Sequence, residues 1–389
     1  MEDVVDSNLA VREALAKFSG TQAKDWFLCL KQRFGMAEVY KAISEVEDPG
    51  EVITTPYTCI TAINPIIVGG HKPIYADIDP LTLSTGDIPA KLFTKKTRAV
   101  VMQHTLGIVS DKLAAQAKTQ KTLLIEDSAH ALLRFAKSED GQILADISAH
   151  SFGVEKIIPG TKFGGAIYLN PRLETERPAL YAAIIRRLGM LPTPDKSLAR
   201  RIKHYRTCNA ILQRSPHNIR PALRNFAIKA KILEPAVYPF EQEAQQADSM
   251  TTNDFVNQTI LKNIKNLKQN YARRTASVKY YQKHLKSENF EAVVDSAQPL
   301  LAYPIAFSSP AKAAQVYDIL MSSGFFIRRW YTPLLYPGPL NNRKYAFNPQ
   351  KTPIAEQMSV RTISLPTDLP NSELAKIVKI LADSPKSTP

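Results

Sequence analysis

Short apolar runs alternate with amphipathic stretches over the first 170 residues of the chain. Stretches with apolar residues at three- and four-residue spacing predict helices at 8–17, 35–43, 59–68 and 110–119. Apolar runs of four to six residues predict strands at 51–56, 73–77, 98–103, 122–126 and 166–169. Strands that alternate with helices are typical of βαβ units, so we predict a mostly parallel sheet with helices on both faces.

This alternation stops at about residue 171. Helical patterns rich in arginine and interrupted by prolines predict an inserted helical region over 171–248. One long helix or two consecutive helices are expected at 253–286, followed by a smaller α+β domain. We therefore predict a large domain at 1–248 that includes the insertion, and a second part at 249–389 made of the long helix and the small C-terminal domain.

The composition is that of a soluble globular protein. The 389 residues are 44% apolar and 22% charged, and the three cysteines are widely spaced. Such spacing argues against a disulfide framework or a zinc site and fits a reducing compartment, so we expect no metal. The N-terminus lacks an apolar signal core, and the apolar runs are too short to span a bilayer. A cytoplasmic location is expected.

The net charge of +14 is concentrated in one segment, because 171–231 holds 14 Lys/Arg and 3 Asp/Glu. A basic segment can bind nucleic acid, a membrane surface or an anionic substrate, or simply face solvent. Its aromatic residues show no interleaved stacking pattern, which argues against nucleic acid. Docking on an anionic membrane would need an amphipathic helix with a broad apolar face, for which 181–190 is the candidate stretch.

A lysine and a carboxylate stand out as candidate chemistry. Lys156 lies five residues after Ser151 and eight before a Gly-Gly pair. A desolvated lysine can form a Schiff base with a carbonyl cofactor, although an isolated lysine is more often a surface residue. Asp127 follows an apolar strand, where a carboxylate either caps a helix or holds a heterocyclic nitrogen protonated. His130, three residues on, would lie beside it.

Together these motifs resemble a known family. The order and spacing are similar to those of the pyridoxal-phosphate (PLP) nucleotide-sugar aminotransferases of the DegT/DnrJ type, which have the aspartate aminotransferase fold (fold type I). The matching segments are EDSAH at 126–130, SFGVEK at 151–156, GGA at 164–166, PGEVITTPYTC at 49–59, GHKPIYADID at 70–79, QHTLG at 103–107 and RTISLP at 361–366. The resemblance is good over residues 35–170 and weaker over 250–385.

The resemblance implies a cofactor site. Lys156 would hold PLP through a Schiff base and later move a proton, while Asp127 would pair with the pyridinium nitrogen. His130 would lie near the ring oxygen, and Ser151 would bind the phosphate. Two further elements would complete the site: a helix N-terminus at Gly35 and Met36 for the phosphate, and Cys59 where the family usually has an aromatic residue over the ring.

The resemblance also implies the reaction and its partners. We expect an amino group to pass from an amino acid, glutamate in the first instance, to a keto sugar nucleotide in amino-sugar or surface-glycan biosynthesis. Arg328, Arg329 and Tyr331 are the candidate substrate-binding residues, because arginine pairs suit carboxylates and diphosphates. A homodimer is expected from the family. Two alternatives stay open: another fold-type-I PLP enzyme, such as a lyase or decarboxylase, and a member without turnover that acts as a regulator or scaffold.

Overall fold

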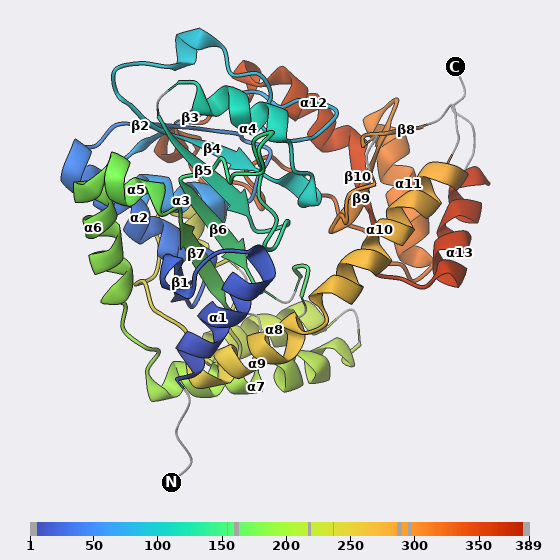
Figure 1. Cartoon of the computed structure of the whole chain (residues 1–389). Helices are drawn as coiled ribbons and strands as arrows, with labels where there is room; N and C mark the ends of the chain where they lie inside the picture. Colours follow the sequence, from blue (N-terminus) through green and yellow to red (C-terminus); the bar gives the residue numbers. More distant parts are fainter. Residues whose placement is uncertain are drawn as a thin grey trace.

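A seven-stranded sheet forms the centre of the larger part of the computed structural model, which describes residues 6–120, 122–153, 155–158, 163–216, 219–235, 237–285, 290–294 and 297–383 (Figure 1). The strand order is β1-β7-β6-β5-β4-β2-β3, and only β7 is antiparallel to its neighbours. The strands are β1 Trp26–Cys29, β2 Glu51–Thr54, β3 Lys72–Tyr75, β4 Thr97–Gln103, β5 Leu123–Ser128, β6 Ile147–Ser151 and β7 Gly165–Leu169. The predicted α/β fold is confirmed.

Both faces of this sheet are buried, which explains the unbroken apolar runs. On β4, Val100 and Met102 pack with the helix α4, whereas Ala99 and Val101 belong to the core on the opposite face. Successive side chains of a strand point to opposite faces, so a strand covered on both sides must be apolar at every position. The helices of this part are α1 Ser7–Ser19, α2 Gln32–Glu47, α3 Ile60–Val68, α4 Asp111–Lys118, α5 Arg172–Glu176 and α6 Pro178–Gly189.

A three-stranded antiparallel sheet organises the C-terminal part, on the right of Figure 1. Its strands are β8 Phe290–Ala292, β9 Ala302–Phe307 and β10 Thr362–Pro366, and its helices are α11 Pro310–Ser322, α12 Pro353–Arg361 and α13 Asn371–Ala382. Short 3₁₀ helices occur at Ala23–Asp25, Ala90–Leu92, Thr105–Gly107, Pro239–Glu243, Asn342–Tyr345 and Pro349–Lys351. A core separate from that of the large sheet holds this part together.

Two consecutive helices, α9 Asp254–Ile264 and α10 Leu267–His284, join the two parts. Val256 and Ile260 of α9 belong to the core of the large sheet, and α9 packs against α1. Val278 and Tyr281 of α10 belong to the core of the C-terminal part. The packing of the large part therefore continues past residue 248, and the division there stays a prediction.

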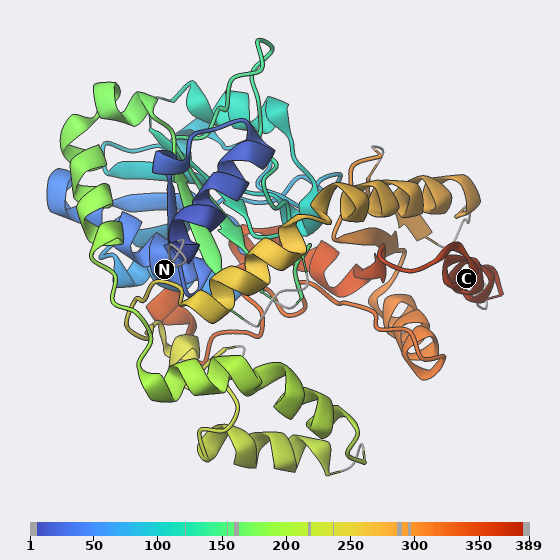
Figure 2. The same cartoon turned by 60° about the horizontal axis from the view of Figure 1, so that its bottom comes forward.

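The basic segment folds into two different structures. Its first helices cover the large sheet, because α6 packs on α2 and buries Ala183, Ile184 and Leu188. The second structure is a helical hairpin of α7 Lys196–Gln213 and α8 Arg220–Lys229, which projects from the body in Figure 2. The insertion predicted over 171–248 thus projects only at α7 and α8, because the 3₁₀ helix Pro239–Glu243 packs back against α3. None of the helices within the described residues is long and apolar enough to cross a membrane.

Candidate active site

A cavity opens at the carboxyl ends of β4, β5 and β6, where parallel sheets commonly bind ligands. Its empty volume is about 1190 Å³, a value that includes open solvent at its mouth. Strand ends and the first turns of α2 and α3 supply most of its walls. Of the predicted site residues, seven line it: Met36, Cys59, Asp127, His130, Ser151, Lys156 and Tyr331.

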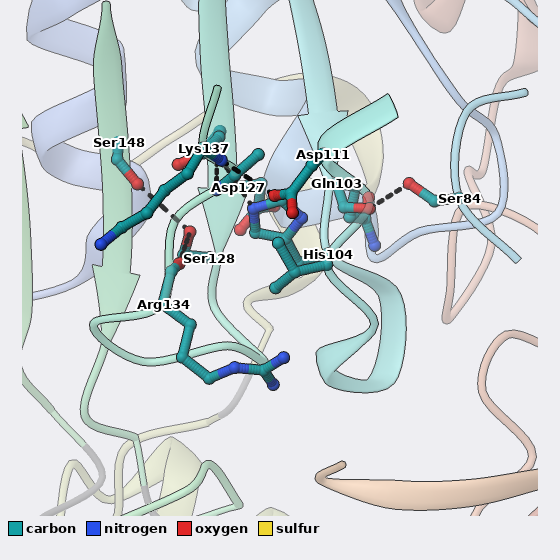
Figure 3. A network of polar contacts seen from close by, with 12 residues as sticks. Ser84, Gln103, His104, Asp111, Asp127, Ser128, Arg134, Lys137 and Ser148 are labelled. Carbon is teal, nitrogen blue, oxygen red and sulfur yellow. Dashed lines mark hydrogen bonds and ion pairs between the residues drawn. The ribbon is translucent and has the colours of Figure 1, made fainter. Parts of the chain in front are cut away.

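Buried polar contacts tie the strand ends together beneath this cavity (Figure 3). The backbone N–H of His104 donates to the carbonyl of Asp127 at 3.0 Å, and the Ser128 and Ser148 hydroxyls are 3.1 Å apart. Below them, Nε2 of His104 lies 3.3 Å from Oε1 of the fully buried Glu126. These contacts fix the edge of the sheet on which the candidate catalytic groups stand.

Lys156 lies in the loop that follows β6. Its backbone N–H donates to the carbonyl of Gly153 at 2.9 Å, and its Nζ is 5.3 Å from the centre of the Trp330 ring. Burial lowers the pKa of Lys156, while the nearby Cys59 and Asp127 act in the opposite direction. A lysine with a lowered pKa has a larger neutral fraction, which is the form that attacks a carbonyl.

Asp127 is the penultimate residue of β5, and its two carboxylate oxygens have different surroundings. Oδ1 accepts hydrogen bonds from Nε2 of Gln32 at 2.7 Å and from the N–H of Ala129 at 3.1 Å. The carbonyl of Ala149 holds the same Gln32 amide at 3.1 Å. Within the described part of the chain Oδ2 has no hydrogen-bond partner, and Asp127 lines the cavity. The carboxylate is therefore held in place on one side and available on the other.

His130 is buried and neutral. Its Nδ1 accepts a hydrogen bond from the N–H of Leu106 at 3.1 Å, which assigns the ring proton to Nε2. Burial, together with the charges of Lys156 and Arg328, holds the pKa of His130 well below its usual range. The ring stacks on Trp330, with centroids 5.0 Å apart and planes 9° apart. His130 thus offers an oriented Nε2–H donor at the cavity wall.

The helix N-terminus predicted at Gly35 and Met36 lies one turn earlier. Helix α2 begins at Gln32 and the N–H of Phe34 already donates to the carbonyl of Lys31, so the N–H groups at the open end of the helix belong to residues 31–33. Met36 reaches the cavity, but Gly35 does not line it. A β-carbon on Gly35 would lie 2.5 Å from Cγ1 of Ile167, so this glycine allows α2 to pack closely on β7. Close packing therefore explains a glycine at position 35. The spacing of motifs along the sequence cannot distinguish such a glycine from one that binds a ligand.

The Gly-Gly pair at 164–165 serves the same close approach. A β-carbon on Gly165 would lie 2.5 Å from the backbone nitrogen of Gln32, and Gly164 has a φ of 113° that favours glycine. The N–H of Gly164 donates to the carbonyl of Leu30 at 2.7 Å. The pair therefore brings the start of α2 against the end of the sheet and places Gln32 beside Asp127.

Ser151 and Cys59 stand on opposite sides of the cavity. Ser151 is the last residue of β6, and its Oγ accepts from the N–H of Gly153 at 3.4 Å. Cys59 precedes α3, and its sulfur accepts from the hydroxyl of Thr61 at 3.0 Å. Both side chains are half-buried and reach the cavity, so each is open to a ligand.

The candidate substrate residues divide into two groups. Tyr331 lines the cavity, with its hydroxyl 3.4 Å from Nε2 of His130. Arg328 lies behind it, with its guanidinium carbon 5.1 Å from the centres of both the Phe326 and Trp330 rings. Arg329 points elsewhere, toward the ring of Tyr317 and the carbonyl of Val360. Neither arginine lines the cavity, and only Arg328 is close to it.

Two residues of the site were not predicted from the sequence. Gln32 holds Asp127, and Trp330 lies between Lys156, His130 and Arg328. Lys31 and Gln32 follow the apolar run at 26–30, and polar residues after a strand are a usable signal. The position of Trp330 depends on how the C-terminal part docks on the large sheet, which no local pattern reports.

The residues of this cavity fit PLP. The free Oδ2 of Asp127 suits a protonated ring nitrogen, and Nε2–H of His130 suits a ring oxygen. The first turn of α2 offers backbone N–H groups to a phosphate. The guanidinium of Arg33, in contrast, forms a bidentate pair with buried Glu241, at 2.6 and 3.0 Å, and supports the start of α2.

Comparison with known proteins identifies the family and several relatives of this chain. Residues 2–382 match the DegT/DnrJ/EryC1/StrS aminotransferase family. The dTDP-4-amino-4,6-dideoxy-D-glucose transaminase of Shigella dysenteriae is 33% identical over 148 residues, which are 37% of this chain and 40% of that protein. The spore coat polysaccharide biosynthesis protein SpsC of Bacillus subtilis is 38% identical over 28% of this chain and 29% of its own. These matches span less than half of either relative.

Solved structures extend the likeness to the whole fold. The Helicobacter pylori protein PseC, described as an aminotransferase involved in the biosynthesis of pseudoaminic acid, has a TM-score of 0.69 at 18% identity. The superposition covers 97% of this chain and 91% of PseC. At this identity the likeness establishes the fold and leaves the substrate to be argued from the site.

Proposed function

The chain belongs to the DegT/DnrJ/EryC1/StrS aminotransferase family, and from that premise we propose that it transfers an amino group from an amino acid to a keto sugar nucleotide with PLP as cofactor. The observation that carries the proposal is the meeting of Lys156 and Asp127 in one cavity at the carboxyl edge of the sheet. A nucleophilic amine and an ionisable partner for the ring nitrogen in one cavity are what PLP chemistry requires.

Four groups would hold the cofactor. Asp127 would bind the ring nitrogen, His130 the ring oxygen, and the first turn of α2 together with Ser151 the phosphate. When bound, PLP supplies a ring that withdraws electrons from the carbon next to the substrate nitrogen. Gln32 keeps the Asp127 carboxylate in the orientation that this contact needs.

Lys156 would move the proton of the reaction. Its pKa is lowered by burial, so the side chain is closer to equal populations of amine and ammonium at neutral pH than an exposed lysine. The same residue can then accept a proton from one carbon and return it to another. The side chains of Trp330 and Tyr331 limit the access of water to the amine of Lys156, and this keeps its pKa lowered.

Arg328 would receive the donor's carboxylate. It lies against Trp330, with the aromatic rings holding its guanidinium in place. A planar guanidinium binds a carboxylate through two parallel hydrogen bonds. The charge of Arg328 acts on Lys156 and His130 at the cavity, whereas Arg329 is directed to Tyr317. We therefore assign Arg328, together with Tyr331, to substrate binding, and leave Arg329 out of the site.

The expected amino donor is glutamate, and the expected acceptor is a dTDP-linked keto hexose. The purified holoprotein should lose its visible absorbance on addition of glutamate while one equivalent of 2-oxoglutarate forms, and should recover it on addition of the keto sugar nucleotide. Failure of every amino acid to produce its keto acid would overturn the proposal. Release of carbon dioxide in place of the keto acid would indicate a decarboxylase.

We also propose a homodimer in a reducing, cytoplasmic compartment. The family resemblance supports the dimer, and the three free cysteines fit the compartment. Light scattering on the eluted protein should give twice the mass of 43.3 kDa. A monomer that remains fully active would contradict the dimer and leave the reaction unaffected.

A further inference from the structure

The α7–α8 hairpin carries a concentration of positive charge that the site does not use. Between residues 196 and 231 the chain has ten Lys/Arg and no Asp/Glu. In Figure 2 the hairpin projects from the body, with α8 as the lower helix, farthest from the large sheet. Its small core is formed by Tyr205, Ala227 and Leu233. The hairpin is therefore a charged element with two helices largely open to their surroundings.

Helix α7 presents a cationic face. Ile202 and Tyr205 are buried toward the body and α8, whereas the charged residues of the opposite side are exposed. The exposed cations recur at helical spacing and are Lys196, Arg200, Lys203, Arg206 and Arg214. Because the Debye length is about 8 Å at physiological ionic strength, these charges act on any anionic surface that the hairpin meets.

Helix α8 presents an apolar face to solvent. Ile219, Leu223 and Phe226 lie on one side, at spacings of four and three residues, and are 45%, 38% and 67% exposed. The exposed Ala222 and Ala230 belong to the same side. The opposite side packs toward α7 through the partly buried Ile228, and the buried Ala227 lies between the two sides. An exposed phenylalanine flanked by leucine and isoleucine is costly in water unless another surface covers it.

We propose that the α7–α8 hairpin docks on an anionic lipid bilayer. Apolar side chains that enter the headgroup region and cations that pair with anionic lipids are the two signals of interfacial helices, and a pair of such signals holds a protein at a membrane reversibly. The proposal goes beyond amino transfer and does not depend on it. It would place the enzyme at the membrane surface, with the cavity connected to the hairpin through Pro235.

Other occupants fit the hairpin less well. Nucleic acid would pair with the cations of α7 but would leave the apolar side of α8 uncovered. A second copy docked hairpin to hairpin would bring two cationic segments together, each with ten Lys/Arg and no Asp/Glu over 196–231, which is electrostatically unfavourable. The stretch 181–190, the membrane candidate predicted from the sequence, turns the side with Ala183, Ile184 and Leu188 toward the large domain, where α6 packs on α2. The apolar side of α8 is the surface that remains.

Co-sedimentation of the full-length holoprotein with vesicles tests this proposal. We expect binding to an equimolar mixture of phosphatidylcholine and phosphatidylglycerol and not to phosphatidylcholine alone. Arg200→Gln and Lys203→Gln should each weaken binding about fivefold, as should added salt. The double variant Leu223→Ser with Phe226→Ser should weaken it roughly tenfold or more, since both side chains lose apolar area.

The control is Leu81→Ser, which removes a leucine that is 68% exposed outside the hairpin and should leave vesicle binding unchanged. Far-ultraviolet circular dichroism and amino transfer without vesicles should match the unmodified protein in every variant. Binding that ignores anionic lipid, or that survives the Leu223→Ser and Phe226→Ser changes, would overturn the proposal. So would a change from dimer to monomer in that double variant with unchanged vesicle binding, because α8 would then contact a second copy.

Discussion

The cavity and the α7–α8 hairpin use charge in opposite ways. In the cavity, charged side chains are buried against specific groups, such as Glu126 beside His104 and Arg33 on Glu241. On α7, cations such as Lys203 and Arg206 are exposed along one face of a helix. Burial shifts protonation equilibria and fixes orientation, whereas exposed charge acts at a distance and is screened by salt.

The difference shows where each kind of function can reside. Chemistry needs a pKa that departs from its usual value, and the large sheet provides it by surrounding Lys156 and His130 with packed walls. Docking needs only charge and apolar area, and a hairpin with a small core can supply both. The same kind of substitution should therefore have very different effects in the cavity and in the hairpin.

The largest contrast is expected between two lysines. Lys156→Ala should lower the rate of amino transfer by roughly a hundredfold to ten-thousandfold, because the amine that moves the proton is lost. Lys203→Ala on α7 should leave the rate unchanged. Initial rates of 2-oxoglutarate formation at saturating substrate measure both. Comparable losses in the two variants would show that the cavity lysine has no special role.

The next contrast concerns two buried leucines. Leu169→Ala in β7 should lower the free energy of unfolding by about 2–5 kcal/mol, because it leaves a hole in the core of the large sheet. Leu233→Ala should mainly increase amide hydrogen exchange within α7 and α8, since Leu233 belongs to the small core of the hairpin. Denaturant titration and hydrogen exchange distinguish the two. Equal losses of global stability would indicate that the hairpin is part of the main cooperative unit.

The sequence anticipates those features of the fold that depend on neighbouring residues. Alternate residues of β4 face opposite cores and are all apolar, so the strand and its burial on both sides could be predicted. Asp127 directly follows the strand predicted at 122–126, so its position at the carboxyl edge of the sheet followed from the parallel order. The strand that ends at Ser151 was not predicted. These inferences need no knowledge of which distant segments touch.

Features set by contacts between distant segments could not be predicted. Gln32 reaches Asp127 across 95 positions of the chain, and Gly35 packs closely on Ile167 of β7. The helix over 181–190 is amphipathic in either environment, so its pattern could not tell a membrane from the surface of α2. Arg328 and Arg329 are neighbours in sequence, and only the docking of the C-terminal part separates their roles.

A pH titration examines the buried histidines of the large sheet. Burial lowers the pKa of His150 to about 3, against 6.5 for an ordinary histidine, so the unfolded chain binds more protons between these values. The stability conferred by neutral His150 should thus be present above pH 6.5 and fall by about 1.4 kcal/mol per pH unit below it. His150→Gln should reduce the slope of the unfolding free energy against pH by the amount that corresponds to one bound proton. An unchanged slope would contradict the assignment.

A smaller effect is expected from the group that holds Asp127. Gln32→Leu removes a hydrogen bond to a charged oxygen at 2.7 Å, and should raise the dissociation constant for PLP about tenfold. Gln116→Leu, at an exposed position of α4, is the matched control and should leave that constant unchanged. Fluorescence titration with PLP measures the affinities. An unaltered affinity in Gln32→Leu would mean that Asp127 needs no support from α2.

The smallest contrast is between the adjacent arginines. Arg328→Lys should raise KM for the amino donor roughly fivefold with little change in kcat, because a lysine cannot form the two parallel hydrogen bonds to a carboxylate. Arg329→Lys should leave both constants unchanged, since its side chain contacts Tyr317. Steady-state kinetics with varied glutamate decides the matter. A larger effect at Arg329 would reverse the assignment of the two residues.

The central claim is that Lys156 is the residue that holds the cofactor. Both Lys31 and Lys156 line the cavity, so the experiment must identify which lysine carries the cofactor. The holoprotein should be reduced with borohydride, digested and analysed by mass spectrometry. We expect the added mass of the reduced cofactor on the peptide that contains Lys156, and none in Lys156→Ala. A label on Lys31, or no covalent label at all, would contradict the account.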